Sequence, residues 1–158
     1  MFKIGQYLVY RKDVCEVKEI KEKEGKEYYQ LTPIDDDSLK IEVPIDNDCL
    51  RNVISKQEME NLINKIPSID IIDCNDRMIE LEYRNLISTG EKEDLIKVIK
   101  TAYLRNKERL NNKKKLSEKD TSYQEKAEKL LYNELRVVLN LTFDQVKEYI
   151  INKVEALV

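Results

Sequence analysis

The sequence predicts an α+β protein in which a small β-barrel precedes an all-α domain. Up to position 54 the apolar residues alternate with polar ones, the pattern of half-buried strands. After Ser55 the apolar residues recur every three or four positions, the pattern of helices with one buried face. Ser or Thr followed three residues later by Glu, Asp or Gln marks several helix starts in this second half.

Five short strands are expected before Ser55. Lys40 and Glu42 alternate with apolar neighbours, and Gly25 marks a hairpin connection between two strands. Five strands in about 54 residues predict a small barrel. The expected strands cover Phe2–Tyr10, Val14–Ile20, Tyr28–Thr32, Leu39–Val43 and Leu50–Ile54.

Five helices are expected after the strands, and three of them begin at capping signals, at Ser55, Ser117 and Thr142. The change of pattern predicts a domain boundary within Pro67–Asp73, so that residues 1–66 form a β domain that folds alone and residues 73–158 form a helical domain. The expected helices run from Ser55 to Ile66, from about Asp73–Asp76 to Gly90, from Glu91 to Leu110, onward from Ser117, and onward from Thr142.

The composition gives no support to an enzyme. The chain has no histidine, only three glycines, and none of the common phosphate-binding or nucleophile motifs. We therefore expect no catalytic residue, cofactor, metal or small-molecule substrate. The loop Asp35–Asp37 is chemically able to bind a cation, but a solvated turn is the favoured interpretation.

The cysteines and the hydropathy suggest a cytoplasmic protein. Cys15, Cys49 and Cys74 are an odd number with wide spacing, so buried, reduced thiols are expected. No apolar stretch approaches the roughly 18 residues that a membrane span requires, and the first residues lack the apolar core of a signal peptide. We accordingly expect no contact with a membrane.

Positive charge is concentrated in one segment of a chain whose net charge is −3. Between Lys97 and Lys119 there are nine basic and two acidic side chains, a local net charge of +7. One interpretation is a helix C-terminus with favourable cations, followed by a solvated loop. The other is a surface that contacts nucleic-acid phosphates without sequence specificity.

Several motifs, in order along the chain, resemble the CarD/CdnL family of bacterial transcription regulators. In the helical half the resemblance rests on the segment 103–109, Leu116-Ser117, and 125–135. In the first half the matching motifs are Phe2-Lys3-Ile4-Gly5-Gln6-Tyr7-Leu8-Val9-Tyr10, Lys26-Glu27-Tyr28, Leu39-Lys40-Ile41-Glu42-Val43-Pro44 and Leu50-Arg51-Asn52-Val53-Ile54-Ser55.

This resemblance implies a Tudor-like β-barrel that docks on the lobe of the RNA polymerase β subunit. It also implies a helical domain that contacts promoter DNA at the upstream edge of the melted bubble and stabilises the open complex. The expected polymerase-binding residues are Leu39, Lys40, Ile41, Glu42, Val43 and Pro44, where an edge strand can extend the sheet of a partner. The expected DNA-binding residues are Arg105, Lys107, Arg109, Lys114 and Lys126.

The chain departs from the family pattern at two positions. Many relatives have a tryptophan that wedges into the minor groove, and its counterpart here falls near Asp76, whose carboxylate cannot intercalate and is repelled by phosphate. Some relatives have an arginine at the position of Glu42. Polymerase docking is therefore better supported than the DNA contact, and a protein-interaction adaptor without DNA binding is the alternative.

Overall fold

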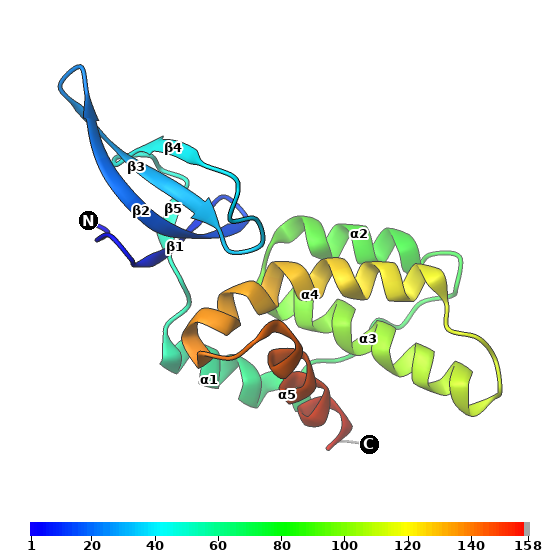
Figure 1. Ribbon diagram of the computed structural model, residues 1–158. Coiled ribbons are helices and arrows are strands. Elements are labelled where there is room, and N and C mark those ends of the chain that lie inside the picture. Colours follow the sequence, from blue (N-terminus) through cyan, green and yellow to red (C-terminus); the bar gives the residue numbers. More distant parts are fainter. Residues whose placement is uncertain (157–158) are drawn as a thin grey trace.

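The computed structural model describes residues 1–156. An antiparallel sheet formed by the first third of the chain projects from one end of a helical bundle (Figure 1). The chain leaves the sheet once and does not return to it, so the molecule has the α+β architecture that the sequence predicts.

The sheet is open, and the barrel expected from the sequence is not confirmed. Its five strands lie in the order β4-β3-β2-β1-β5, so β4 and β5 are the two free edges. Closure requires pairing between these edge strands, and each of them has only one neighbour in the sheet. The strands are β1 (Tyr7–Tyr10), β2 (Asp13–Lys23), β3 (Lys26–Pro33), β4 (Ile41–Pro44) and β5 (Leu50–Asn52).

The longest strands, β2 and β3, form a hairpin that extends beyond the rest of the sheet (Figure 1). Its turn contains only Glu24 and Gly25, and both have positive φ, 51° and 77°. A two-residue turn of this kind matches the right-handed twist of the paired strands. The charged residues on each side of Gly25 therefore belong to the strands, although the sequence pattern suggested a longer connection.

One face of the sheet encloses a small apolar core. Phe2 closes one side of it by packing edge-on against Tyr29, with ring centroids 5.9 Å apart, while its backbone N–H donates to the Tyr29 hydroxyl. The buried members are Leu8, Cys15, Val17, Tyr29, Leu31 and Val43. Six residues are few for an independent core, so the sheet depends strongly on each of them.

The cysteines differ in their environments, which corrects the expectation that all three are buried. Cys15 lies in the core of the sheet, where burial and nearby Asp13 raise the pKa of its thiol to about 11. Cys49 is exposed in the loop before β5, and Cys74 is half-buried. All three are free thiols.

The bundle contains five helices, and the three capping signals predicted from the sequence mark helix starts in the structure. Ser55, Ser117 and Thr142 each accept a hydrogen bond from the third residue of the helix that follows. Helix α2 begins later than predicted because Asn75 forms a turn with the N–H of Met78. The helices are α1 (Lys56–Lys65), α2 (Ile79–Thr89), α3 (Lys92–Asn111), α4 (Glu118–Leu139) and α5 (Phe143–Glu155), and a short 3₁₀ turn, η1 (Ile66–Ser68), follows α1.

Helix α1 packs with the other helices and not with the sheet. Its buried residues Met59, Leu62 and Ile63 belong to the same core cluster as residues of α2, α3, α4 and α5. The change of packing partner therefore comes before α1, ahead of the predicted boundary at 67–73. None of the helices in residues 1–156 has the length and apolar character needed to cross a membrane.

A buried carboxylate on α4 joins the sheet to the bundle. Glu134 is 3% exposed and receives two hydrogen bonds from the Arg51 guanidinium of β5, at 2.9 and 3.1 Å. The same carboxylate accepts from the backbone N–H of Ile54, and Lys92 of α3 lies 3.7 Å away. Glu134 thus fixes the chain between the last strand and the first helix against the middle of the bundle.

Candidate polymerase and nucleic-acid interfaces

The residues expected to bind the polymerase lie at a free edge of the sheet. Strand β4 pairs with β3 on one side and has no strand on the other. Val43 is buried and Ile41 is half-buried against the core of the sheet, whereas Leu39 and Lys40 are exposed in the segment that leads into the strand. The edge therefore presents free backbone groups, and the exposed side chain of Leu39 lies in the segment just before it.

The hydrogen-bond pattern determines which backbone groups of β4 are free. The N–H of Ile45 donates to the carbonyl of Glu27, which makes this pair a hydrogen-bonded pair of the β3–β4 ladder. In an antiparallel ladder such pairs recur every second residue, so Ile41 and Val43 also direct their N–H groups towards β3. Glu42 directs its N–H and carbonyl away from the sheet, and Pro44 has no N–H to offer. Glu42 is therefore the one residue of β4 with an outward backbone donor.

The side chain of Glu42 is paired within the sheet. Its carboxylate oxygens lie 2.8 and 3.0 Å from the ammonium nitrogen of Lys23, near the tip of the β2–β3 hairpin. This hydrogen bond lowers the pKa of the Glu42 carboxyl. Both side chains are exposed, so the pair contributes little to stability.

The opposite edge, β5, is less suited to binding a partner strand. It contains only three residues, Leu50–Asn52, and leads through Ile54 directly to α1. Arg51 at its centre is held by Glu134. A partner strand would have to pair beside a segment that is already fixed to the bundle, so β4 is the better candidate edge.

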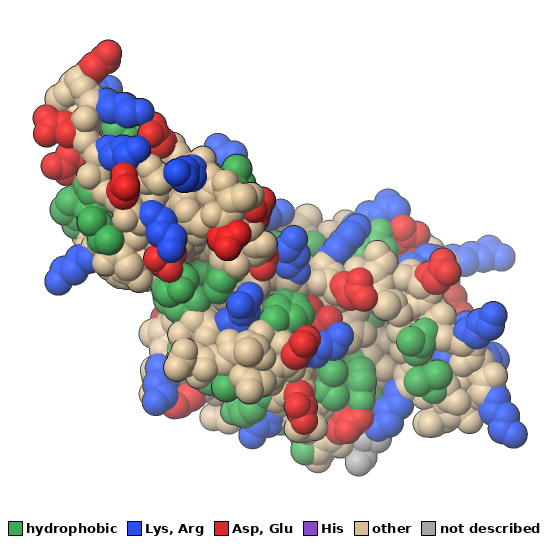
Figure 2. All heavy atoms as spheres, viewed as in Figure 1, with side chains coloured by type: hydrophobic (Ala, Val, Ile, Leu, Met, Phe, Trp, Pro, Cys, Tyr) green, Lys and Arg blue, Asp and Glu red, His purple; other side chains and the backbone are tan. Residues whose placement is uncertain are grey.

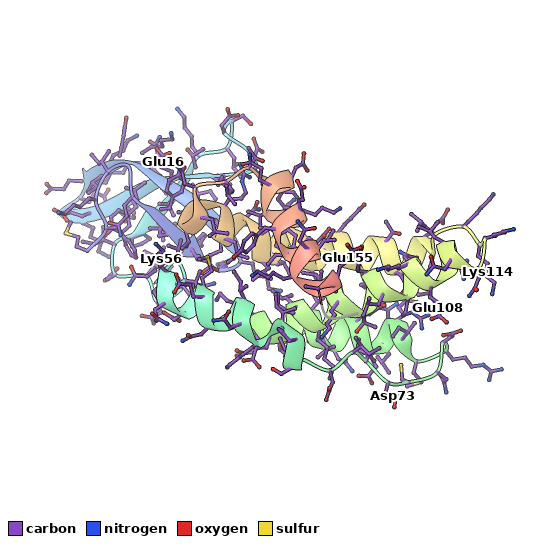
Figure 3. All side chains as sticks on the ribbon, turned by 90° about the horizontal axis from the view of Figure 1, so that it is seen from below. Glu16, Lys56, Asp73, Glu108, Lys114 and Glu155 are labelled. Atoms are coloured by element: carbon purple, nitrogen blue, oxygen red, sulfur yellow. The ribbon has the colours of Figure 1, made fainter. Side chains whose placement is uncertain are left out.

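Positive charge lies at the end of the bundle opposite the sheet. Figure 2 shows several Lys and Arg side chains there, and Figure 3 labels Lys114 and Glu108 at this end, with Asp73 nearby. The end is formed by the C-terminus of α3, the connection 112–117 and the N-terminus of α4. The five residues expected to bind DNA do not form one patch on it.

Arg105, Arg109 and Lys114 do lie together. With Asp76, Glu108 and Asn112 they line a depression of about 200 Å³. Arg109 donates from Nε to the carbonyl of Lys115 at 2.8 Å, which holds the loop in place. Lys113, at the start of this loop, has a positive φ of 58°. The loop therefore has a defined conformation, and Lys114 is exposed on it.

Arg105 has a structural role as well. Its Nε atom lies 3.2 and 3.3 Å from the two carboxylate oxygens of Asp120, a residue that is 1% exposed. The hydroxyl of Tyr83 donates to the same carboxylate at 2.7 Å, and its burial together with this bond raises the pKa of Tyr83. Arg105 therefore joins α3 to α2 and α4, in addition to its place in the depression.

Lys107 and Lys126 lie on other faces. The ammonium of Lys107 is 3.6 Å from Glu155 of α5. That of Lys126 is 4.9 Å from the ring centroid of Tyr123, beside α2. A single phosphate-binding surface can include Arg105, Arg109 and Lys114, but not these two lysines.

The acidic loop before β4 is used for internal contacts. Asp35 accepts a hydrogen bond from the Asn133 amide at 2.6 Å and lies 3.9 Å from both Lys129 and Arg136. Asp36 caps the turn at Ser38. Within residues 1–156 no group of three or more acidic or thiol side chains is placed to hold a metal ion.

Several charged residues have partners that the sequence does not reveal. Asp76 is the counterpart of the family tryptophan in the sequence, and its carboxylate lies 3.1 Å from Nη1 of Arg105. Glu134 and Asn133 were assigned no role, although they contact the sheet. These contacts join residues 29 to 98 positions apart, and local periodicity gives no signal for such pairs.

Comparison with protein families and with curated proteins finds no match. The resemblance to the CarD/CdnL family therefore rests on the motifs quoted above.

Proposed function

We propose that this chain is a transcription regulator that binds the lobe of the RNA polymerase β subunit through β4 and contacts promoter DNA through the α3–α4 end of the bundle. In this proposal the DNA contact lies near the upstream edge of the bubble and stabilises the open complex. The same proposal assigns to the sheet the polymerase-docking role of the family's Tudor-like domain.

The observation that carries the proposal is the free edge of β4. The motif Leu39–Pro44 resembles the polymerase-binding strand of the family, and it coincides with the edge of the sheet that has no partner. A strand added there gains backbone hydrogen bonds from Glu42, and apolar contact from exposed Leu39.

The DNA contact is supported by the position of the cations. Arg105, Arg109 and Lys114 line the depression at the α3–α4 end of the bundle. This end lies farthest from the sheet, so one partner can occupy each end of the molecule (Figure 1). Phosphates are bound by such side chains with little regard to base sequence. The separation allows the protein to join polymerase to upstream DNA.

The polymerase contact is tested by replacing Glu42 with proline. Glu42→Pro removes the outward N–H of β4 and leaves the β3 ladder intact, a change that edge strands tolerate. Binding to an isolated β-lobe fragment should fall by more than about tenfold, the equivalent of roughly 1.4 kcal/mol. The control Glu42→Gln removes the ion pair with Lys23 but keeps the N–H, and should bind within about twofold of wild type. Ile41→Pro is a poorer test because the N–H of Ile41 faces β3.

Hydrogen exchange provides a second measurement that needs no variant. The amide of Glu42 should exchange more slowly when the lobe is bound, because it acquires an acceptor. Equal binding by a folded Glu42→Pro variant, together with unchanged exchange at Glu42, would reject strand addition.

The alternative function is a protein-interaction adaptor whose cations are only solvated. The pairing of Lys107 with Glu155 and of Arg105 with Asp120 favours this alternative at those two residues. Open-complex lifetime separates the two functions: the regulator lengthens it, and Arg109→Ala shortens it again. An adaptor binds the polymerase and leaves the lifetime unchanged.

A further inference from the structure

The depression at the α3–α4 end contains both a fixed guanidinium and a removable carboxylate. Arg105 and Arg109 are one turn apart on α3, so their side chains share a face. Asn112 and Lys114 approach from the loop, and Asp76 approaches from the segment before α2. The depression thus combines three cations, an amide and the carboxylate of Glu108 from one part of the chain with the carboxylate of Asp76 from another.

The guanidinium of Arg105 is oriented by a buried partner. Asp120 is 1% exposed, holds the Nε edge, and is itself fixed by Tyr83. The Nη1 atom therefore faces the depression, where its partner is Asp76 at 3.1 Å. Orientation before binding lowers the entropic cost of capturing an anion.

The carboxylate of Asp76 is held far more weakly than that of Asp120. The Asp76 side chain is 87% exposed, and Arg105 is its only hydrogen-bond or ion-pair partner within residues 1–156. An ion pair with so exposed a member has little net strength. Asp76 can therefore leave Arg105 without exposing any buried group.

We propose that this depression binds the phosphate backbone of a nucleic acid, and that Asp76 occupies the phosphate position on Arg105 until the nucleic acid displaces it. Carboxylate and phosphate oxygens compete for the same guanidinium donors. Arg109 and Lys114 add charge to the site, and Asn112 adds an amide donor. The inference rests on the DNA contact proposed above and names the residue that limits its affinity.

The test is duplex binding by the full chain, measured by fluorescence anisotropy. Asp76→Asn should tighten binding about fivefold, because no carboxylate has to be displaced from Arg105. The slope of log K against log salt should stay unchanged, because the same phosphates are contacted in both complexes. The control Asp73→Asn removes the same charge from the same exposed segment, without a contact to Arg105. It should change the affinity less than twofold and leave the slope unchanged.

The outcomes distinguish this inference from the proposed function. If Asp76→Asn and Asp73→Asn behave alike while wild type binds duplex, the DNA contact stands and the role of Asp76 is rejected. If no variant binds duplex, both the DNA contact and the inference are rejected.

The Nε–Hε NMR signal of Arg105 identifies the source of the phosphate. In Asp76→Asn it should shift when duplex is added, and an equal shift with inorganic phosphate at constant ionic strength would assign the site to phosphate from either source. A shift with duplex alone assigns it to the nucleic-acid backbone, and no shift with either ligand overturns the proposal.

Discussion

The sheet and the bundle are built from the same kinds of residue but are stabilised differently. The sheet buries a cluster of six apolar residues, whereas the bundle buries twenty. The sheet presents a free backbone edge, whereas the far end of the bundle presents charged side chains. The two proposed interfaces therefore depend on different physical interactions, and the sheet is the more fragile of the two supports.

The largest expected effect comes from removing one core side chain from each region. Leu31→Ala and Leu131→Ala each remove a side chain that is at most 1% exposed, and each should lower the free energy of unfolding by about 2–5 kcal/mol. Because six residues form the core of the sheet, Leu31→Ala should unfold the sheet while the helices stay folded.

Far-UV circular dichroism and amide exchange measure the two regions separately. In Leu31→Ala the helical signal should melt close to the wild-type temperature, while the sheet amides lose protection. Leu131→Ala should lower the melting temperature of the helices. If both variants lower one common transition equally, the two regions unfold as a single unit and the contrast between them is wrong.

A smaller effect is expected at the junction. Glu134→Ala leaves the backbone N–H of Ile54 without its acceptor and releases Arg51, so it should destabilise the protein by about 1–3 kcal/mol in urea unfolding. Glu125→Ala, an exposed position of the same helix, is the control and should stay within about 0.5 kcal/mol. Equal effects of the two variants would mean that the junction adds nothing to stability.

The smallest effect concerns a second buried carboxylate of α4. Glu128 is 1% exposed, and its contacts to Gln124 and Lys147 are long, 3.4 and 3.5 Å. Burial raises the pKa of this carboxyl, and Lys147 opposes the shift only in part. Between the ordinary glutamate pKa of 4.5 and the raised value, the folded state binds the proton that the unfolded state has released.

The sign of the pH dependence follows from this difference. The protonated carboxyl stabilises the fold below pH 4.5, and this contribution is lost as the pH rises through the raised pKa. Glu128→Gln should therefore raise the melting temperature by a few degrees at neutral pH, with the difference vanishing in acid. The exposed control Glu148→Gln should show no such trend. A lower melting temperature at neutral pH would show that the pair with Lys147 outweighs burial.

Local features of the fold could be predicted because they depend on residues that are close together in the sequence. The cap at Ser117 and the capping box of Thr142 and Gln145 depend on side chains within one turn of the helix start. The later start of α2 was missed because Asn75 forms a turn that competes with the helix. The number of strands predicts a closed barrel, but closure depends on whether β4 pairs with β5. The local sequence pattern carries no information about that pairing.

The candidate site was predictable in part for the same reason. The run of cations is visible in the sequence, and the structure brings Arg105, Arg109 and Lys114 together. It places Lys107 on another face, because residues 107 and 109 are about 200° apart around a helix. Lys126 lies on α4, beside the ring of Tyr123. The neutralisation of Arg105 by Asp76 and Asp120 depends on tertiary contacts.

The central claim is that one chain binds the polymerase through backbone groups and DNA through charged side chains. The most direct test measures the affinity of the same protein for the isolated β lobe and for a duplex, each at about 50 and 200 mM salt. Three phosphate contacts give a slope near −2.7, so duplex binding should weaken roughly 40-fold. Lobe binding should change by less than about threefold, because strand addition relies on neutral hydrogen bonds. Absence of lobe binding, or a duplex affinity that does not respond to salt, would contradict the claim.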